Sequence, residues 1–239
     1  MSVETLTAEL PADVEALREL CLAQREQLRR LERDALTGLL RREPWHDRAE
    51  AWLADPETGP WALAFLDLDG FKPVNDRLGH AAGDELLRAI GGRLSAWAER
   101  AGALVGRLGG DEFAALWPSA GPEAARVGAA EVARRIAVPV LLTGDGLPPA
   151  VRGAQVRVTA SVGVVRQADH PDAGLGELLG LADAAMYRAK EAGEAGAPGP
   201  RVWLADPDVA AWRERAACQR PAGERRAGRP YPAPTTPPE

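Results

Sequence analysis

The sequence predicts a mixed α/β (α+β) domain in which a central sheet is covered by helices. Short apolar runs that are typical of buried strands are interspersed with longer segments whose apolar residues recur every three or four positions. The chain has 239 residues, which suits one such domain with flanking segments, and 46% of them are hydrophobic, enough to fill its core.

The N-terminal segment 1–33 is expected to hold a helix over 11–33. Seven residues follow one another at alternating spacings of three and four, and all but one are apolar: Val14, Leu17, Cys21, Gln24, Leu28, Leu31 and Ala35. This heptad pattern predicts a parallel coiled-coil stalk. The alternative is an amphipathic helix that packs on its own domain.

Residues 34–204 are expected to form the domain itself. The predicted strands are short apolar or β-branched runs: 61–66, 103–107, 112–117, 156–165 and 201–204. Gly109-Gly110 lies between the second and third of them and indicates a hairpin. The predicted helices carry apolar residues at helical spacing: 84–97, 123–136 and 175–190. The Gly- and Pro-rich stretch 143–152 is expected to be a loop.

The C-terminal segment 205–239 has no helical or strand periodicity and becomes rich in proline. Proline at this density prevents helices and central strands, so the segment is predicted to be disordered. Its arginines could contact an unidentified regulatory partner, and a solvated tail without a partner is the alternative.

The composition excludes several classes of protein. A net charge of -6 gives no strong basic field that would recruit nucleic acid. The two cysteines, Cys21 and Cys218, are too far apart in sequence for a disulfide framework or a metal site. No apolar run approaches the roughly 18 residues of a membrane span, and the N-terminus does not resemble a signal peptide. The expected setting is therefore the cytoplasm.

The first candidate site, residues 67–72, follows the predicted strand 61–66. A carboxylate at the end of a buried strand is costly unless something compensates its charge. Mg²⁺ prefers hard oxygen ligands and could bind the Asp67 carboxylate and the Leu68 carbonyl. The alternative is a turn in which Asp67 or Asp69 caps the next segment.

The second candidate site, residues 107–113, contains the Gly-Gly turn followed by Asp111 and Glu112. Two glycines allow a tight turn and the close approach of a ligand. Acidic groups that converge on the strand end at Asp67 would repel one another without a cation between them. The alternative is an ordinary hairpin with solvated acids.

The third candidate site contains Asn75, His80 and Asp84. A carboxylate can accept hydrogen bonds from guanine N1–H and the exocyclic amine, and an amide can address O6 or N3, so Asn75 and Asp84 are suited to reading guanine. Alternatively, Asp84 is the N-cap of the helix predicted after it, and His80 is a capping or core residue.

In this order the motifs resemble those of the GGDEF diguanylate cyclase family. Five segments carry the resemblance: 34–39 (DALTGL), 67–87 (DLDGFKPVNDRLGHAAGDELL), 107–113 (RLGGDEF), 158–163 (VTASVG) and 182–190 (ADAAMYRAK). The resemblance covers residues 34–204. It implies a fold like the palm of polymerases, with an antiparallel-rich sheet flanked by helices, and the Mg²⁺-dependent condensation of two GTP into cyclic di-GMP.

The resemblance also implies roles for individual residues. Mg²⁺, with Mn²⁺ as an alternative ion, would be held by Asp67, the Leu68 carbonyl and Asp111. Asp111 would accept the proton of the attacking 3′-hydroxyl, with Glu112 close by, and Lys72 would stabilise the transition state.

Further residues would bind the substrate. Asn75 and Asp84 would contact guanine, with His80 near the nucleotide, and Lys190 would bind terminal phosphate. Each subunit of the family binds one GTP and the product is two-fold symmetric, so the active species would be a homodimer.

Two positions depart from the family's pattern. The inhibitory product site Arg-x-x-Asp corresponds to Arg100 and Ala103, so half of it is missing and weak product inhibition is predicted. The arginine that usually follows the last helix is Glu194, which would repel phosphate unless Arg188 or Arg201 substitutes for the missing charge.

Three other functions remain open. A catalytically silent module that binds GTP or a protein partner is favoured by Glu194, but Asp67, Asp111 and Glu112 are intact. A cyclase that makes a mixed GMP–AMP ring is disfavoured because Asp84 is retained. The third is a scaffold without nucleotide chemistry.

Overall fold

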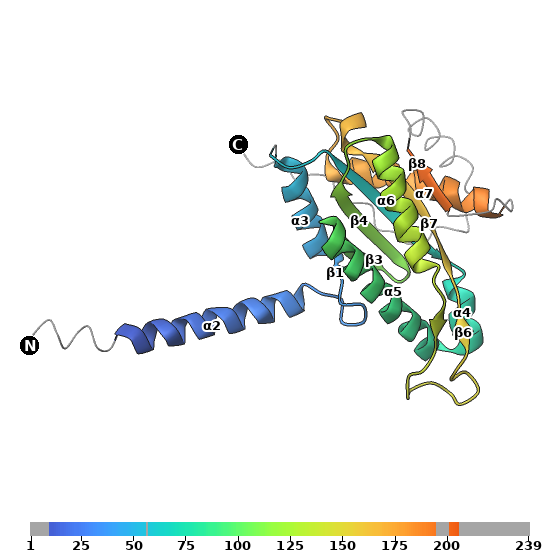
Figure 1. Ribbon diagram of the computed structural model, residues 1–239, viewed down its shortest axis with the longest axis horizontal. Helices are drawn as coiled ribbons and strands as arrows, with labels where there is room; N and C mark the ends of the chain where they lie inside the picture. The colour runs from blue at the N-terminus through green and yellow to red at the C-terminus, as the bar shows by residue number, and fades with distance from the viewer. Residues whose placement is uncertain (1–9, 56, 195–200, 206–239) are drawn as a thin grey trace, which may run out of the picture.

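A six-stranded sheet forms the centre of the computed structural model, which describes residues 10–55, 57–194 and 201–205 (Figure 1). In spatial order its strands are β1 (Leu40–Arg41), β3 (Leu104–Gly109), β4 (Glu112–Pro118), β2 (Trp61–Asp69), β7 (Thr159–Arg166) and β8 (Arg201–Leu204). The four inner strands pair antiparallel, whereas β1 and β8 pair parallel to their neighbours at the two edges. The expected antiparallel-rich sheet is confirmed.

Helices cover both faces of this sheet. The side chains of β2 alternate between two hydrophobic clusters, as the period of two in a strand requires. Ala62, Ala64 and Leu66 face the cluster that contains α5 (His80–Ala101) and α6 (Pro122–Ile136). The residues between them, such as Leu63 and Phe65, face the cluster that contains α3 (Arg42–Ala54) and α7 (Leu175–Glu194). Asp67 belongs by its register to the face covered by α7.

Most of the predicted elements are present, with shifted ends. The hairpin at Gly109-Gly110 joins β3 to β4, and the loop expected over 143–152 is irregular. The strand expected over 156–165 is divided in two, because β6 (Gln155–Val156) pairs with β5 (Val140–Leu141) and β7 begins at Thr159. The 3₁₀ turn η1 (Gln167–Asp169) follows β7.

The sequence interpretation missed two helices for different reasons. In α3 only Trp45 and Ala49 are buried, which is too sparse a pattern to indicate a helix. The eight-residue α4 (Phe71–Leu78) contains Pro73, which usually indicates the end of a helix. Pro73 lies in the first turn, where its missing N–H has no intrahelical partner to lose.

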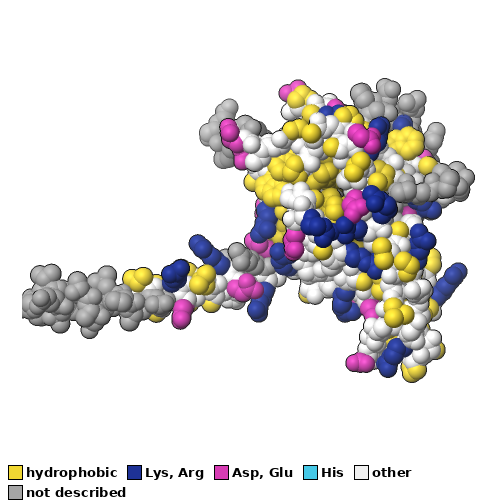
Figure 2. All heavy atoms as spheres, in the orientation of Figure 1, with side chains coloured by type: hydrophobic (Ala, Val, Ile, Leu, Met, Phe, Trp, Pro, Cys, Tyr) yellow, Lys and Arg dark blue, Asp and Glu magenta, His cyan; other side chains and the backbone are white. Residues whose placement is uncertain are grey.

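The helix expected over 11–33 is α2 (Leu10–Leu31), and it extends away from the domain (Figure 1). Its apolar side chains are more than half exposed: Val14, Leu17, Leu20, Leu22 and Leu31. Figure 2 shows hydrophobic side chains along its free surface. The alternative of a helix packed on its own domain is therefore wrong, and the coiled coil stays a prediction.

Other parts of the chain bear on the sequence predictions. In the part of the chain that the structure describes, no helix combines the length and the apolar character that crossing a membrane requires. The tail predicted over 205–239 lies outside the described residues except for Ala205, which is buried and donates its N–H to the Val164 carbonyl at 2.6 Å.

The contact between α7 and the sheet depends on Gly163 of β7. A Cβ at this position would lie 1.9 Å from the Ala182 carbonyl oxygen and 2.1 Å from the Met186 nitrogen, both backbone atoms of α7. We therefore expect Gly163→Ala to lower the free energy of unfolding by roughly 3 kcal/mol, because α7 must move. Urea denaturation measures this.

The matched control is Gly92→Ala on α5, where a Cβ would meet nothing within 4 Å. Alanine at an exposed helix position is favoured over glycine by about 0.5–1 kcal/mol, so this variant should be slightly more stable. An unchanged midpoint for Gly163→Ala would contradict the close approach of α7.

Candidate active site

Acidic and basic side chains meet at the end of β2, on the face covered by α7. Asp67 is 4% exposed and lies in register with Glu112 of β4 on one side and Ser161 of β7 on the other. Lys190, from the C-terminal half of α7, donates a hydrogen bond from Nζ to Asp67 Oδ1 at 2.7 Å. The buried carboxylate is thus compensated by an ion pair.

Negative charge is in excess around Glu112. Burial raises the pKa of its carboxyl group, and the Arg42 guanidinium at 3.8 Å acts in the opposite direction. The carboxylates of Asp67, Asp111 and Asp183 raise the pKa of Glu112 further. A carboxylate that three neighbouring carboxylates repel is suited to a site where a cation binds.

The hairpin tip lies against the end of β2. The Leu68 N–H donates a hydrogen bond to the Asp111 carbonyl at 3.2 Å, and the Asp111 residue is half-buried. Three residues expected at the metal, Asp67, Leu68 and Asp111, are therefore brought together, and Glu112 lies beside them.

The same residues fit Mg²⁺ that arrives with a nucleotide. Among the described residues, no three His, Cys, Asp or Glu side chains form a ready cluster for a metal ion. Mg²⁺ does not require one, because it is usually held by one or two carboxylates together with waters and substrate phosphates. Asp67 and Glu112, on paired strands, supply carboxylates at one point.

The capping alternatives for Asp67 and Asp69, at the end of β2, are wrong. The N-cap of α4 is Gly70, with φ of 78° and no side-chain cap. Asp69 instead accepts hydrogen bonds from Thr159 Oγ1 and Ser161 Oγ, both at 2.8 Å, and pairs with Arg201 at 3.2 Å. Arg201 is thereby held at the same end of the sheet as Lys190.

Lys72 is not brought to Asp67 in this structure. It lies on the exposed side of α4, and its Nζ donates to Asp76 Oδ2 at 2.6 Å, one helical turn away. Contact with a nucleotide would require Lys72 to leave this exposed ion pair, which costs little because such pairs are weak.

The expected guanine-reading residues lie on neighbouring helices. Asn75 is on α4, and its side chain packs against Gly83 of α5, where a Cβ would lie 1.9 Å from Asn75 Oδ1. Asp84 follows Gly83 directly. The N-cap of α5 is Gly79, so the N-cap interpretation of Asp84 is wrong. His80 is the first residue of α5 and is exposed, which excludes a core role.

The segment 34–39, the first of the five that resemble the family, positions the hairpin. The sequence alone did not reveal this contact. Asp34 Oδ1 accepts hydrogen bonds from Thr37 N at 2.8 Å, Thr37 Oγ1 at 2.7 Å and Arg107 NH1 at 3.0 Å. Arg107 also donates from Nε and NH2 to the Gly110 carbonyl, at 3.0 and 2.8 Å. Asp34 thus fixes the arginine that holds the Gly109-Gly110 turn.

Other contributors were also missed. Arg42 donates from Nε to the Leu108 carbonyl at 2.8 Å and so reaches Glu112 from the edge of the sheet. Asp183 lies seven residues before Lys190 on α7, a spacing that places both on one helix face. That spacing was a usable signal, whereas nothing in the sequence singled out Arg42.

The two departures from the family pattern have different surroundings. Ala103 is half-buried and lines a pocket of about 210 Å³. Arg100 is exposed in the last turn of α5. Weak product inhibition stays a prediction. The α7 helix ends at Glu194, whose side chain lies outside the described part. Arg188 lies 5.7 Å from the centre of the Trp203 ring and Arg201 pairs with Asp69, and the substitution of either for the missing arginine stays a prediction.

Known proteins share this fold and sequence. The family model described as "Diguanylate cyclase, GGDEF domain" matches residues 31–195. An uncharacterised 19.3 kDa protein of Streptomyces ambofaciens is 41% identical over 158 residues, 66% of this chain and 78% of that protein. The bifunctional diguanylate cyclase/cyclic di-GMP phosphodiesterase MucR of Pseudomonas aeruginosa is 37% identical over 199 residues, 81% of this chain but only 27% of MucR.

A solved structure shows the same architecture. The coiled coil and GGDEF domain of DgcB from Caulobacter crescentus, in complex with c-di-GMP, superposes with a TM-score of 0.65 at 26% sequence identity. The match covers 86% of this chain and 100% of that one.

The Asp34 contacts predict an acid-dependent loss of stability. Burial raises the pKa of Asp34, but the hydrogen bonds from Thr37 and the Arg107 guanidinium outweigh it and hold the pKa below its usual value. The stabilisation is therefore complete above about pH 4, the unfolded pKa, and is lost as the pH falls through the folded pKa. Asp34→Asn should lower the free energy of unfolding at neutral pH by roughly 1–2 kcal/mol.

Urea denaturation between about pH 3 and pH 7 measures this difference, which should shrink at the acid end. Asp47→Asn, at an exposed position on α3, is the control and should follow the wild type throughout. A deficit that is equally large at both ends of the pH range would show that charge on Asp34 is not responsible.

Proposed function

Because the chain belongs to the GGDEF-domain diguanylate cyclase family, we propose that it condenses two GTP molecules into cyclic di-GMP and releases pyrophosphate. The observation that carries the proposal is the strand end where Asp67, Glu112 and Lys190 meet next to the Gly109-Gly110 hairpin. It combines carboxylates for a divalent ion with a cation for phosphate, which phosphoryl transfer requires together.

The residues at this end of β2 have separate roles in the proposed reaction. Asp67, the Leu68 carbonyl and Asp111 would hold the metal, with Glu112 beside them. Bound Mg²⁺ supplies charge neutralisation at the phosphates and lowers the pKa of the attacking hydroxyl. Asp111 accepts the proton of a GTP 3′-hydroxyl while that oxygen bonds to the α-phosphorus of the second GTP and pyrophosphate leaves. The 3′-hydroxyl of the second GTP then attacks the α-phosphorus of the first in the same way. A second pyrophosphate leaves and the ring is closed.

Lys190 changes partner when the substrate binds. In the nucleotide-free chain its amine neutralises Asp67. If a metal ion were bound at Asp67, Lys190 would be free to donate to the terminal phosphate. Arg201, beside Asp69, supplies a second positive charge where Glu194 replaces the usual arginine. Lys72, on its exposed turn of α4, is the third cation and would stabilise the transition state.

Two copies must act together, because each domain binds one GTP and the product is two-fold symmetric. The exposed apolar side chains of α2 support a homodimer in which two such helices form a parallel coiled coil. Joining the domains through this stalk raises the effective concentration of each active site for the other. An activating signal or partner would act on this assembly.

A catalytically silent module that binds GTP or a protein partner is the alternative. The specific observation in its favour is Glu194, which stands where the family usually has an arginine for the triphosphate. If no other cation replaces that arginine, the domain retains its fold but loses its chemistry.

Activity with Asp111→Asn tests the proposal. Purified wild-type protein with GTP and Mg²⁺ should form cyclic di-GMP, identified by mass. Asp111→Asn keeps the size of the side chain but loses the base, so turnover should fall by at least about a hundredfold. A folded, dimeric wild type that forms no product at high GTP would favour the silent module.

The Lys190–Asp67 contact predicts opposite effects on metal and nucleotide. Lys190→Met removes the ammonium that competes with a metal ion for Asp67, so Mn²⁺ titrated without nucleotide should bind several-fold more tightly, as followed by electron paramagnetic resonance. The same variant should bind GTP about tenfold more weakly, because a charged hydrogen bond to phosphate is lost. Lys72→Met is the control for the metal, because Lys72 is paired with Asp76. Unchanged Mn²⁺ affinity would contradict the competition.

A further inference from the structure

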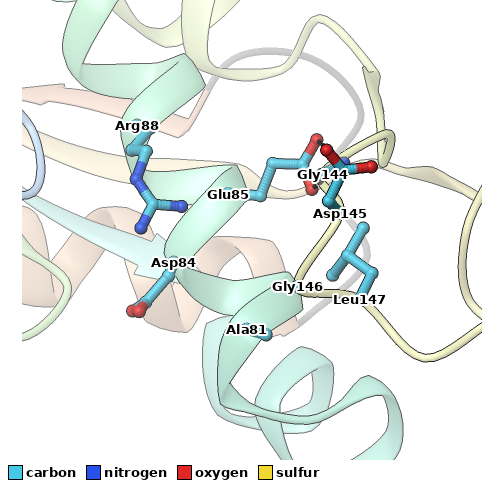
Figure 3. Close-up of a pocket in the computed structure, with 8 residues that line it drawn as sticks. All are labelled: Ala81, Asp84, Glu85, Arg88, Gly144, Asp145, Gly146 and Leu147. Atoms are coloured by element: carbon cyan, nitrogen blue, oxygen red, sulfur yellow. Dashed lines mark hydrogen bonds between the residues drawn. The ribbon is translucent and has the colours of Figure 1, made fainter.

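A pocket of about 320 Å³ lies between the N-terminal half of α5 and the loop after β5 (Figure 3). Asp84, Glu85 and Arg88 contribute one wall, and the loop residues from Gly144 to Leu147 contribute the other. Its volume is at the lower end of the range of about 300–1,000 Å³ that is typical of small-molecule sites.

Hydrogen bonds hold the loop that forms the second wall of the pocket against α5. Glu85 accepts hydrogen bonds from the backbone N–H of Thr143 at 2.7 Å and of Gly144 at 3.1 Å. Arg152 donates to the Asp145 carbonyl at 3.0 Å, and Leu147 is 4% exposed. The acid next to Asp84 is thus committed to the loop and cannot serve a ligand.

Asp84 and Arg88 differ from Glu85 in direction and in partners. Figure 3 shows both projecting from the same side of α5, one turn apart, whereas Glu85 projects toward Asp145. Within the described residues, neither Asp84 nor Arg88 has a hydrogen-bond or ion-pair partner. A carboxylate and a guanidinium about 6 Å apart along the helix therefore present an acceptor and a donor fork side by side.

This pair matches two adjoining edges of guanine. The Watson–Crick edge offers two donors, N1–H and the exocyclic amine, and the Hoogsteen edge offers two acceptors, O6 and N7. A carboxylate only accepts and a guanidinium only donates, and arginine commonly binds O6 and N7 of guanine through two hydrogen bonds. Adenine would present its N1 acceptor to the carboxylate and an amine to the arginine in place of O6, so it would lose the contact with the carboxylate and one of the two with the arginine.

We propose that Arg88 is a specificity-determining residue that reads O6 and N7 of the GTP base while Asp84 reads N1–H and the exocyclic amine. This assignment rests on the proposed function and deepens it. It leaves guanine N3 to Asn75, whose side chain packs against Gly83, the residue before Asp84. Arg88 lies one helical turn after Asp84, the last residue of the third candidate site, and the sequence motifs did not single it out. Its assignment rests on its position beside Asp84 on α5.

The test is a set of binding measurements with base analogues. Calorimetry compares GTP with 7-deaza-GTP, which lacks the N7 acceptor, and with inosine triphosphate, which lacks the exocyclic amine. Wild type should bind 7-deaza-GTP about tenfold more weakly than GTP. Arg88→Met should bind GTP about as weakly and should no longer distinguish it from 7-deaza-GTP, while it still disfavours inosine triphosphate.

Arg126→Met, at an exposed arginine of α6 outside the pocket, is the control and should keep the wild-type preferences. The proposal is overturned if wild type binds GTP and 7-deaza-GTP equally, if Arg88→Met keeps the preference, or if GTP does not bind. Product formation is assayed separately. An Arg88-dependent preference without any cyclic di-GMP would sink only the proposed function and leave the base-reading role standing.

Discussion

The burial of one carboxylate at the end of β2 constrains the rest of this site. The register of three strands buries Asp67 between Glu112 of β4 and Ser161 of β7, and an unpaired charge there would be costly. Lys190 compensates it from α7, so α7 must lie close to the sheet, and Gly163 allows that approach. The chain contains only two lysines among 29 basic residues, and this is one of them. A compact, flexible ammonium can exchange a carboxylate for a phosphate more readily than a planar guanidinium.

A second chain of contacts holds the other half of the site. Asp34 fixes Arg107, and Arg107 fixes the carbonyl of Gly110, so the hairpin that carries Asp111 and Glu112 is anchored to the segment just after α2. The junction is reinforced by Arg48, which pairs with Glu32 at 2.5 Å. A change in the position of α2 would therefore reach the acidic hairpin through few side chains, which gives a physical route from the proposed stalk to the proposed catalytic strand end.

Periodicity predicted much of the fold, because β2, the β3–β4 hairpin and helices α5 to α7 each present a regular apolar pattern to the core. It did not find α4, where Pro73 resembled a helix end, or α3, which buries two residues. Motifs identified Asp67, Asp111 and Asp84, since local spacing carries that information. They could not show that Lys190 bonds to Asp67, because the two are 123 residues apart in sequence, or that Lys72 is turned toward Asp76. Contacts of this kind depend on the tertiary packing.

The proposed metal ligands and the proposed base-reading residues are joined by one short helix, α4. Two glycines with positive φ, Gly70 at 78° and Gly79 at 85°, turn the chain from β2 into α4 and from α4 into α5. Phe71 is buried in the core beneath α4 and prevents the helix from shifting. The separation between the proposed metal ligands at the end of β2 and the α5 residues that line the pocket is therefore set by rigid elements. Under the proposed function one GTP must span that separation, so its phosphates and its base are positioned by opposite ends of α4.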